Sequence, residues 1–259
     1  MTTVTGVAAG GGLLVTEVFS AIQGEGAHVG CRQVFLRLTG CNIRCSYCDT
    51  PESLEARALP ARLERTPGHR DFAVEPSPLT QERVVDAVTA LYRALPHQAV
   101  SVTGGEPLMQ WRRLAAVLEA LHARGCRVAL ETNGMYVEGL RALIDWVDEV
   151  AMDVKLHSVD TQAVPLSVHR RFLEIARGRD VFVKMVIGTD TDAAELEAAV
   201  RMVAETAPAI TVYLQPVTPF GAVLATPSPE RVLDLQARAL RWHRDVRVVP
   251  QTHRLIGQM

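Results

Sequence analysis

The stretch that decides the fold reads Gly40-Cys41-Asn42-Ile43-Arg44-Cys45-Ser46-Tyr47-Cys48-Asp49-Thr50 and places three cysteines within eight positions. Thiolates at this spacing can converge on one metal centre if the backbone curls around it. A closed zinc or iron site uses four protein ligands, whereas this run supplies three, so one position of the centre is left for another group. An iron–sulfur cluster with one differentiated iron fits this count, and so does a zinc ion completed by a distant residue.

The cysteine usage also indicates the compartment. The chain has five cysteines, an odd number, and three of them are packed into one run. This favours a reducing environment and a metal site over disulfide bonds, so we expect a cytoplasmic protein. Cys31 and Cys126 stand apart from the run, and we expect both to be small buried hydrophobic residues.

The composition is that of an ordinary globular protein. With 259 residues, 48% hydrophobic and 22% charged, the chain suits one large domain with a full core. The net charge of −2 gives no argument for nucleic acid or an acidic membrane as a partner. No apolar run approaches the roughly 20 residues that span a bilayer. The first residues lack a basic region ahead of an apolar one, so we expect residues 1–12 to be a flexible lead-in rather than a secretory signal.

From Val34 onward the chain alternates between strand-like and helix-like segments. The expected strands are Val34–Leu38, Ala99–Thr103, Arg127–Glu131, Glu149–Val154, Val181–Ile187, Ile210–Leu214 and Val246–Val249; the expected helices are residues 80–95, Pro107–Arg124, Glu138–Trp146, Ser167–Arg177, Thr191–Thr206 and Pro229–His243. Strands separated by helix-length segments indicate right-handed crossovers and a parallel sheet. We therefore predict a single α/β domain, residues 1–259, built as a partial (β/α)6 TIM-like barrel. A doubly wound open sheet is the alternative.

Two segments near the cysteine run fall outside this alternation. Leu13–Phe19 alternates well enough to predict a first strand. Pro51–Pro78 is an insertion with five prolines and many charges, and it has a weak helical pattern over residues 52–65. We expect the rest of it to be a loop over the surface, and long loops of this kind are often lids or disordered segments.

Polar motifs follow the expected strands. In barrel folds the reactive groups lie on loops at the carboxyl ends of the strands. Here these ends carry the cysteine run, Thr103-Gly104-Gly105-Glu106-Pro107, Glu131-Thr132-Asn133, Asp153-Val154-Lys155 and Gln215-Pro216. Most of these motifs also have a purely structural interpretation, as a strand-to-helix turn, as helix caps or as a surface ion pair.

The cysteine run resembles the CxxxCxxC motif of radical S-adenosylmethionine (SAM) enzymes, and the aromatic Tyr47 before the last cysteine fits that family. Gly104-Gly105-Glu106-Pro107 resembles the family's GGEP motif, which meets the methionyl amine of SAM. The resemblance implies that Cys41, Cys45 and Cys48 are catalytic and hold a [4Fe–4S] cluster, with SAM on its fourth iron. It further implies SAM contacts from Tyr47, Cys48, Asp49, Gly104, Gly105, Glu106, Glu131, Thr132, Asn133 and Lys155. Many relatives have Ser-Pro-Lys where this chain has Asp153-Val154-Lys155, so of these three residues only Lys155 is carried over.

A narrower resemblance comes from the segments on either side. Ser20-Ala21-Ile22-Gln23-Gly24-Glu25-Gly26, Arg37, Asp49-Thr50 and the tail Pro250-Gln251-Thr252-His253 are together similar to the 7-carboxy-7-deazaguanine synthase family. This resemblance implies substrate contacts from Ile22, Gln23, Gly24, Glu25, Arg37, Thr103, Gln251 and His253. It also implies that the hydroxyl of Thr50 holds Mg²⁺ against the substrate, and a hydroxyl is the kind of hard oxygen ligand that Mg²⁺ takes.

The activity that this family resemblance implies is a radical carbon–nitrogen lyase reaction. The enzyme would convert 6-carboxy-5,6,7,8-tetrahydropterin into 7-carboxy-7-deazaguanine with loss of ammonia, in the biosynthesis of queuosine or other 7-deazapurines. The resemblance also implies an electron donor such as flavodoxin or ferredoxin, and a homodimer.

Two other functions remain open from the sequence. One is a different radical SAM enzyme, such as an activase that takes hydrogen from a glycine of a partner protein. The other is a non-enzymatic zinc or iron–sulfur module, which would leave the Gly104-Gly105-Glu106-Pro107 and Gln23-Gly24-Glu25-Gly26 segments without a role.

Overall fold

The computed structural model of the chain describes residues 11–159 and 164–258. Most of the predicted lead-in, residues 1–10, lies outside the described residues. Of its last two residues, Gly12 is held in place, because its carbonyl oxygen accepts a hydrogen bond of 3.1 Å from Arg113 Nη1. The described lead-in therefore packs onto the domain.

The described residues build one ten-stranded sheet with the order β10-β9-β8-β7-β6-β5-β2-β1-β3-β4. Its parallel part consists of β2 (Arg32–Leu38), β5 (Ala99–Gly104), β6 (Val128–Thr132), β7 (Glu149–Asp153), β8 (Asp180–Ile187), β9 (Val212–Pro216) and β10 (Val246–Val248). The first strand, β1 (Val15–Ile22), runs antiparallel to β2. It begins and ends later in the chain than predicted.

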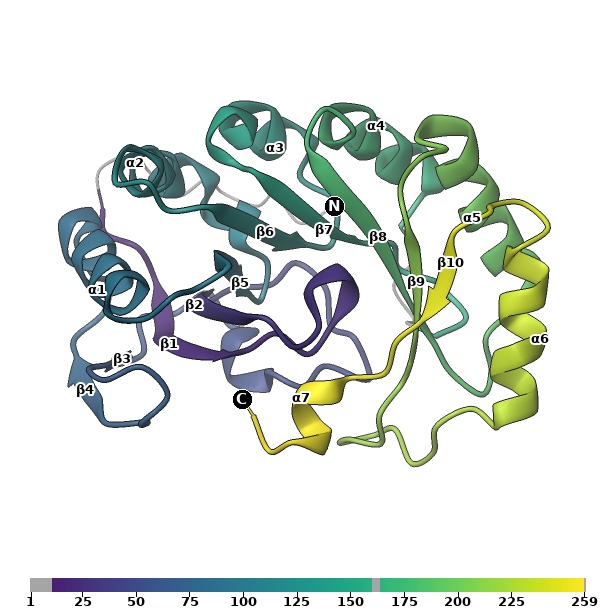
Figure 1. Cartoon of the computed structure of the whole chain (residues 1–259), viewed down its shortest axis with the longest axis horizontal. Coiled ribbons are helices and arrows are strands. Elements are labelled where there is room, and N and C mark those ends of the chain that lie inside the picture. Colours follow the sequence, from purple (N-terminus) through teal and green to yellow (C-terminus); the bar gives the residue numbers. More distant parts are fainter. Residues whose placement is uncertain (1–10, 160–163, 259) are drawn as a thin grey trace.

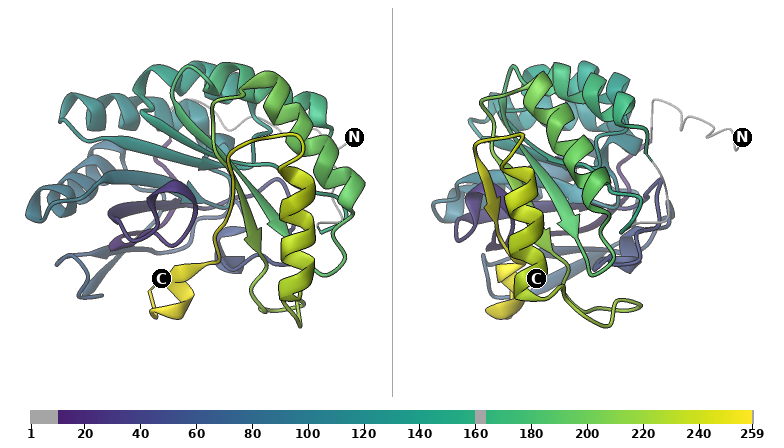
Figure 2. Two further views of the ribbon diagram at one scale, coloured as in Figure 1. Left: turned by 45° about the vertical axis from the view of Figure 1, so that its right-hand side comes forward. Right: turned by 90° about the vertical axis from the view of Figure 1, so that its right-hand side faces the viewer.

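Helices cover one face of the curved sheet, as Figures 1 and 2 show. They are α1 (Gln81–Ala94), α2 (Trp111–Ala123), α3 (Val137–Leu143), α4 (Leu166–Ala176), α5 (Ala193–Thr206) and α6 (Pro229–Ala239). Because these helices lie on the outer side only, the doubly wound alternative is wrong and the partial barrel is confirmed. None of the helices in the described ranges is long and apolar enough to cross a membrane.

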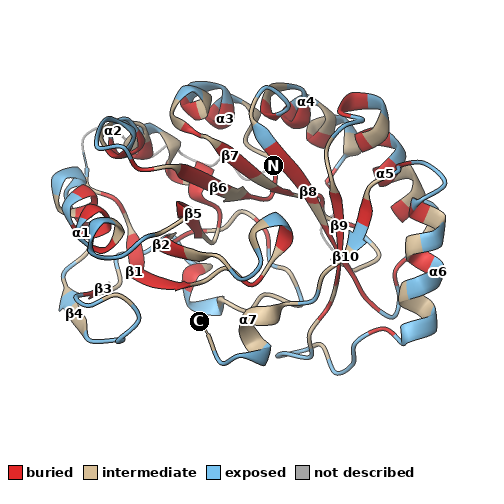
Figure 3. Ribbon diagram, viewed as in Figure 1, coloured by how far each residue is buried: buried red, intermediate tan, exposed pale blue. Residues whose placement is uncertain are grey.

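Helix α1 illustrates how the sequence produces this arrangement. The hydroxyl of Thr80 caps the helix by accepting a hydrogen bond from the Arg83 amide. Val84, Val88 and Leu91 recur at helical spacing and are buried against the sheet. The same division holds along the barrel, where the strands and the inner sides of the helices are buried and the outer sides are exposed (Figure 3).

Three of the predicted helices differ from the structure by more than two residues at one end. The segment predicted as one helix over Pro107–Arg124 is divided into a 3₁₀ turn, η3 (Pro107–Gln110), and the α-helix α2. The segment predicted over Glu138–Trp146 likewise becomes α3 followed by the 3₁₀ turn η4 (Ile144–Trp146). The last predicted helix ends at Ala239 instead of His243. Such differences arise because tight turns and α-helices share one apolar spacing over short segments.

The insertion Pro51–Pro78 differs most from its prediction. After the 3₁₀ turn η2 (Pro51–Ser53) it forms a hairpin of β3 (Ala61–Glu64) and β4 (Phe72–Glu75), and β3 extends the sheet by pairing with β1. The prediction of a surface loop with a helical stretch is therefore wrong. Four-residue strands show too little of the two-residue period to be recognised among so many prolines and charges.

The two outlying cysteines differ from each other. Cys126 is only 3% exposed within the core, as predicted. Cys31 is half-buried, so it is less enclosed than expected. All five cysteines lie in the described ranges, and none of them forms a disulfide bond there.

Candidate active site

The open side of the barrel contains a cavity of about 430 Å³. The predicted residues that line it are Ile22, Gln23, Gly24, Glu25, Arg37, Cys41, Cys45, Tyr47, Cys48, Asp49, Thr50, Thr103, Gly104, Gly105, Glu131, Thr132, Asn133, Lys155, Gln251 and His253. Glu106 is the one predicted site residue that does not line it. The structure therefore brings segments from all parts of the chain to one enclosure.

The cysteine loop is held open toward this cavity by backbone contacts. Gly40 turns the chain with φ +96, a conformation that glycine adopts without strain. The amides of Gly40 and Cys41 then donate to the carbonyls of Ser53 and Leu54 at 2.8 and 2.9 Å. As a result the thiols of Cys41, Cys45 and Cys48 all face the cavity.

This donor set fits an iron–sulfur cluster. Three cysteines of one short loop, none of them in a disulfide bond, line a cavity that is large enough for a further ligand. Burial raises the pKa of the Cys41 thiol, and a metal would hold it as the thiolate that ligates. Neither of the other two described cysteines, Cys31 and Cys126, lines the cavity, so a cluster held here would keep one ligand position for another group.

The two glycines after β5 are required by the cysteine loop. A Cβ on Gly104 would lie 2.1 Å from the Leu38 carbonyl oxygen, and a Cβ on Gly105 would lie 2.3 Å from that of Gly40. The expected reason for these glycines was close approach of the main chain to SAM. In the structure they first permit the close approach of the loop that carries the cysteines.

Glu106, which was predicted to contact SAM, does not line the cavity. It is 1% exposed, and its carboxylate accepts hydrogen bonds from the Leu108 amide at 3.0 Å, the Thr132 hydroxyl at 2.9 Å and the Asn133 amide at 2.8 Å. Burial raises the pKa of Glu106 to about 7, although these hydrogen bonds lower it. Its oxygens already accept these hydrogen bonds, so Glu106 connects the turn after β5 to the end of β6.

Asn133 connects the end of β6 to the cysteine loop through a hydrogen bond. Its Nδ2 donates to Asn42 Oδ1 at 2.8 Å, so a side chain from the β6 end holds a residue that directly follows the first cysteine. The ring of His169 lies behind, with Nε2 3.2 Å from the Asn133 carbonyl oxygen. Neither Asn42 nor His169 was expected in the site, because an isolated polar residue carries no recognisable spacing.

A chain of largely buried charges lies along the cavity wall. Lys155 Nζ donates to Asp153 Oδ2 at 2.7 Å, and Lys184 Nζ lies 3.4 Å from the same oxygen and 2.5 Å from Glu25 Oε2. Burial lowers the pKa of each lysine, but the carboxylates raise it by more, so both stay charged. Lys155 also stands over the Tyr47 ring at 5.2 Å.

Lys184 was missed in the sequence. It is the one charged residue in the middle of the apolar strand segment Val181–Ile187, and this was the available signal. A charge in a parallel strand that is buried on both faces needs a partner, and here the partner is Glu25 from a distant loop.

Glu25 is surrounded by donors. Besides Lys184, its carboxylate accepts from Gln215 Nε2 at 3.1 Å and from Gln251 Nε2 at 2.9 Å. Burial raises the pKa of Glu25, but the Lys184 ammonium and the hydrogen bond from Gln251 together lower it by more, so the net shift is downward. Glu25 therefore stays an anion inside the barrel.

Glu131 lies among the predicted substrate residues. Its carboxylate accepts from Gln23 Nε2 at 2.9 Å, from the Ser101 hydroxyl at 2.6 Å and from the Thr103 hydroxyl at 3.0 Å. The sequence interpretation placed Glu131 with SAM and placed Gln23 and Thr103 with the substrate. Their direct contact puts all three groups on one side of the cavity.

The C-terminal tail closes the cavity with a short helix, α7 (Thr252–Leu255), which was not predicted. The Thr252 amide donates to the Gly24 carbonyl oxygen at 3.0 Å. Gly24 must be a glycine here, because a Cβ would lie 2.2 Å from Nδ1 of His253. The tail thus packs directly on the loop that carries Gln23 and Glu25.

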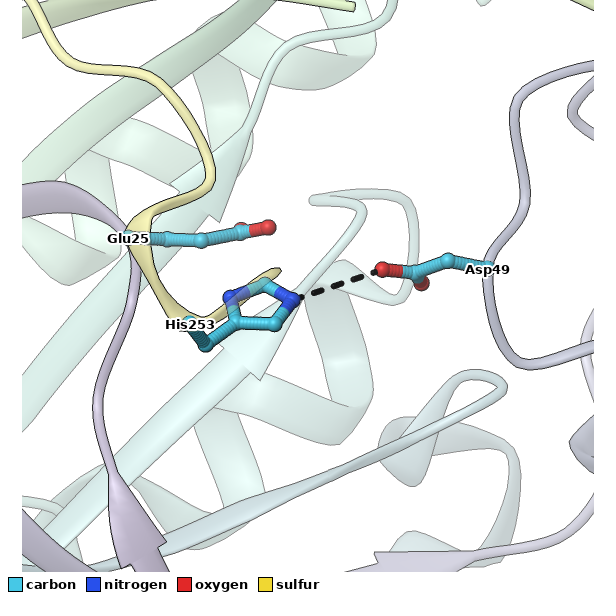
Figure 4. A group of neighbouring side chains, drawn as sticks. All are labelled: Glu25, Asp49 and His253. Carbon is cyan, nitrogen blue, oxygen red and sulfur yellow. Dashed lines mark ion pairs between the residues drawn. The ribbon is translucent and has the colours of Figure 1, made fainter. Parts of the chain in front are cut away.

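Asp49 joins this tail to the cysteine loop. Its carboxylate accepts from Gln251 Nε2 at 3.0 Å and lies 3.8 Å from His253 Nε2 and 3.3 Å from Arg254 Nη2. Burial raises the pKa of Asp49, but His253 and Arg254 lower it by more, to well below its usual range. Figure 4 shows Asp49 and His253 pointing toward each other beside Glu25. Arg254 was also missed in the sequence.

Two places in the cavity offer ligand atoms for a hard cation such as Mg²⁺. The hydroxyl of Thr50 lines the cavity beside the last cysteine, 3.9 Å from the Cys48 sulfur. Ligand atoms of Glu25, Asp49 and His253 also lie within 4.8 Å of one another, but Asp49 is already compensated by its arginine and amide partners. Thr50 is therefore a better candidate ligand than this group for a Mg²⁺ ion that a bound substrate would share.

The comparisons with known proteins agree with this geometry. Residues 36–203 match the family model described as the Radical SAM superfamily. Together, the fold, the three-cysteine loop and this match define the protein as a radical SAM enzyme, a class that uses a [4Fe–4S] cluster and SAM.

The relatives narrow the class. The chain is 42% identical over 250 residues to a 7-carboxy-7-deazaguanine synthase of Geobacter sulfurreducens, covering 96% of this chain and 98% of the relative. It is 36% identical to one of Methanopyrus kandleri, over 95% and 94% of the two chains. The crystal structure of QueE from Escherichia coli has the same fold, with a TM-score of 0.57, 18% identity and coverage of 92% and 93%. The chain belongs to the 7-carboxy-7-deazaguanine synthase family.

Proposed function

We propose that this protein converts 6-carboxy-5,6,7,8-tetrahydropterin into 7-carboxy-7-deazaguanine, with loss of ammonia, in the biosynthesis of queuosine or another 7-deazapurine. The observation that supports this best is that one cavity joins the three cysteine thiols to a set of buried carboxylates, amides and an arginine. Such a set suits a small heterocycle that carries both N–H donors and a carboxylate.

The cofactor side of the cavity consists of the cysteine loop and the ends of β5 and β6. Cys41, Cys45 and Cys48 would hold the cluster, and the backbone at Gly104 and Gly105 with Thr132 and Asn133 would contact SAM. The cluster and SAM, when bound, supply a one-electron cleavage that yields a 5′-deoxyadenosyl radical able to take hydrogen from the substrate. Glu106 and Asn42 hold these segments together through their hydrogen bonds with Asn133.

The substrate side is formed by Gln23, Glu25, Thr103 and Glu131. A pterin presents N–H groups along one edge, and the buried carboxylates of Glu25 and Glu131 are suitable acceptors for them. Lys184 keeps Glu25 charged, which preserves its ability to accept. Ile22 and Gly24 complete this wall of the cavity.

The substrate carboxylate would meet positive groups. Arg37 lines the cavity with a side chain that is 12% exposed, and Thr50 offers a hydroxyl for Mg²⁺ near the cysteine loop. A guanidinium and a divalent cation both offset a carboxylate in an enclosed site. Gln251 and His253 on the tail line the same cavity and would exclude water from it.

The proposal includes the setting of the enzyme. Residues 1–259 would act as one domain in the cytoplasm, as a homodimer, with flavodoxin or ferredoxin as the electron donor. A low-potential cluster needs such a donor, and its three cysteines need a reducing compartment.

The test is an anaerobic assay of the reconstituted protein with SAM, a reductant, Mg²⁺ and 6-carboxy-5,6,7,8-tetrahydropterin. We expect 7-carboxy-7-deazaguanine by mass spectrometry, and we expect none from the Cys45→Ala control. If 5′-deoxyadenosine forms without any deazaguanine, the protein is a different radical SAM enzyme, such as a glycyl-radical activase. A colourless protein that binds one zinc would identify a non-enzymatic module instead.

A further inference from the structure

Glu17 on β1 lies between two arginines of the neighbouring strands. In the β-sheet register it is directly opposite Arg37 on β2 and beside Arg62 on β3. Its carboxylate accepts a hydrogen bond of 2.9 Å from Arg37 Nε, and Arg62 Nη1 lies 3.7 Å from its other oxygen. Glu17 itself is 4% exposed.

The contact with Glu17 leaves one end of the Arg37 guanidinium available. Arg37 lines the cavity, whereas Glu17 does not, so the carboxylate holds the guanidinium from behind. Among the described residues, no group accepts a hydrogen bond from either Nη of Arg37. The ring of Phe19 supports the guanidinium at 5.4 Å. The Nη groups are thus the part that a ligand in the cavity can reach.

The charges on these three side chains do not cancel. Two guanidinium groups flank one carboxylate, so one positive charge remains. Arg62 is half exposed, so solvent and salt screen its charge, whereas Arg37 is mostly buried. The excess positive charge is therefore effective at the cavity, where an anionic group of the ligand would be attracted to it.

We propose that Glu17 is a positioning residue that orients Arg37 toward the carboxylate of the substrate, and that the β3–β4 hairpin contributes through Arg62. The inference rests on the proposed function, because it assigns the role of a residue at that same site. An arginine side chain has many rotamers, and holding Nε in place removes most of them before the ligand arrives. The role of the insertion, which the sequence left open, is then to stabilise Glu17 behind the substrate site through Arg62.

A purely structural ion pair would look similar in the structure, so the experiment must separate the two. The proposal predicts that Glu17 affects only the recognition of a carboxylate on the ligand. A structural role would weaken binding of every ligand in the cavity to the same degree.

The experiment measures binding of two unreactive probes, 6-carboxypterin and pterin, to the anaerobic holoenzyme with SAM bound. We expect the wild type to bind 6-carboxypterin more tightly. We expect Glu17→Gln to weaken binding of 6-carboxypterin about tenfold, since one charge-assisted contact is misaligned, and to change pterin binding less than about twofold. Arg37→Ala should show the same selectivity loss. Glu75→Gln, which breaks an arginine pair on the outer side of the same hairpin, is the matched control and should change neither.

Several results would overturn the inference. If Glu17→Gln weakens both probes equally, or weakens neither, Glu17 does not position Arg37 for a carboxylate. If Glu17→Gln does not assemble, Glu17→Asp replaces it, and an unchanged preference for 6-carboxypterin then counts against the inference. If the wild type turns over 6-carboxy-5,6,7,8-tetrahydropterin but the variants lose no selectivity, the inference alone fails. If the wild type binds neither probe and gives no product, the proposed function fails with it.

Discussion

Lys184 Nζ lies 2.5 Å from Glu25 Oε2, and this contact joins the middle of β8 to a loop 159 residues earlier in the chain. The same ammonium lies 3.4 Å from Asp153 Oδ2. One lysine therefore compensates part of two buried carboxylates inside the barrel. Ionic contacts therefore connect the segments that form the proposed substrate side.

We expect Lys184→Gln to lower the free energy of unfolding of the apoprotein by about 3–5 kcal/mol, because it leaves buried carboxylates without their ammonium. Urea unfolding followed by circular dichroism measures this. Arg83→Gln is the control, since its pair with Glu75 is largely exposed, and it should lose at most about 1 kcal/mol. A loss for Lys184→Gln as small as that of the control would contradict the role given to Lys184.

Glu106 leads to a prediction about pH. Its pKa is raised to about 7 in the folded protein, so the folded state binds the proton more tightly than the unfolded state does. Its contribution to stability is then fully present below about pH 4.5 and is lost as the pH rises through about 7. Glu106→Gln removes this titration.

The measurement compares wild type and Glu106→Gln at pH 5 and pH 8. Between these values the wild type should lose about 2.5 kcal/mol relative to the variant, since other groups titrate equally in both. At pH 5 the variant should already be less stable by about 1–3 kcal/mol, because an amide N–H faces the donors at Leu108 or Asn133. A difference that does not change with pH would show that Glu106 stays ionised throughout this range.

Substitution of Gly24 tests whether the C-terminal tail belongs to the substrate site. In Gly24→Ala the new Cβ would lie 2.5 Å from the backbone nitrogen of His253, so α7 must move away. We expect KM for the pterin to rise at least about tenfold while cluster content and SAM cleavage without substrate are retained. Gly178→Ala is the control, since its Cβ would meet nothing closer than 3.9 Å. An unchanged KM in Gly24→Ala would remove the tail from the site.

The parallel part of the fold could be predicted because each strand and helix there has a clear period. Segments such as Val181–Ile187 and Thr191–Thr206 are long enough for the apolar pattern to distinguish strand from helix. The β3–β4 hairpin could not be predicted, since its strands are short and β3 has only two buried apolar residues, Ala61 and Leu63. Its pairing partner β1 also lies more than 40 residues away in sequence.

The candidate site was predictable where residues stand in motifs. The cysteine run and Gly104-Gly105-Glu106-Pro107 have fixed spacing, and the expected strand ends placed them on one side of the barrel. Lys184 and Arg254 have no such spacing, and their partners Glu25 and Asp49 are identified only once the chain is folded. Glu106 belongs to a motif, but only the structure shows that its carboxylate faces away from the cavity.

The central claim is that three cysteines hold a [4Fe–4S] cluster with one iron left for SAM. Replacing Cys41, Cys45 or Cys48 by Ala should abolish cluster assembly and turnover, because no other described cysteine lines the cavity. Iron and sulfide analysis after anaerobic reconstitution checks this, and the wild type should contain about four irons per chain. Cys126→Ala is the control and should keep its full iron content.

The most direct measurement is the electron paramagnetic resonance spectrum of the reduced wild-type protein, recorded without and with SAM. We predict the signal of a reduced [4Fe–4S] cluster that changes when SAM is added, because SAM binds the iron that lacks a cysteine. A protein without iron, or a cluster whose spectrum is the same in both samples, would contradict the account.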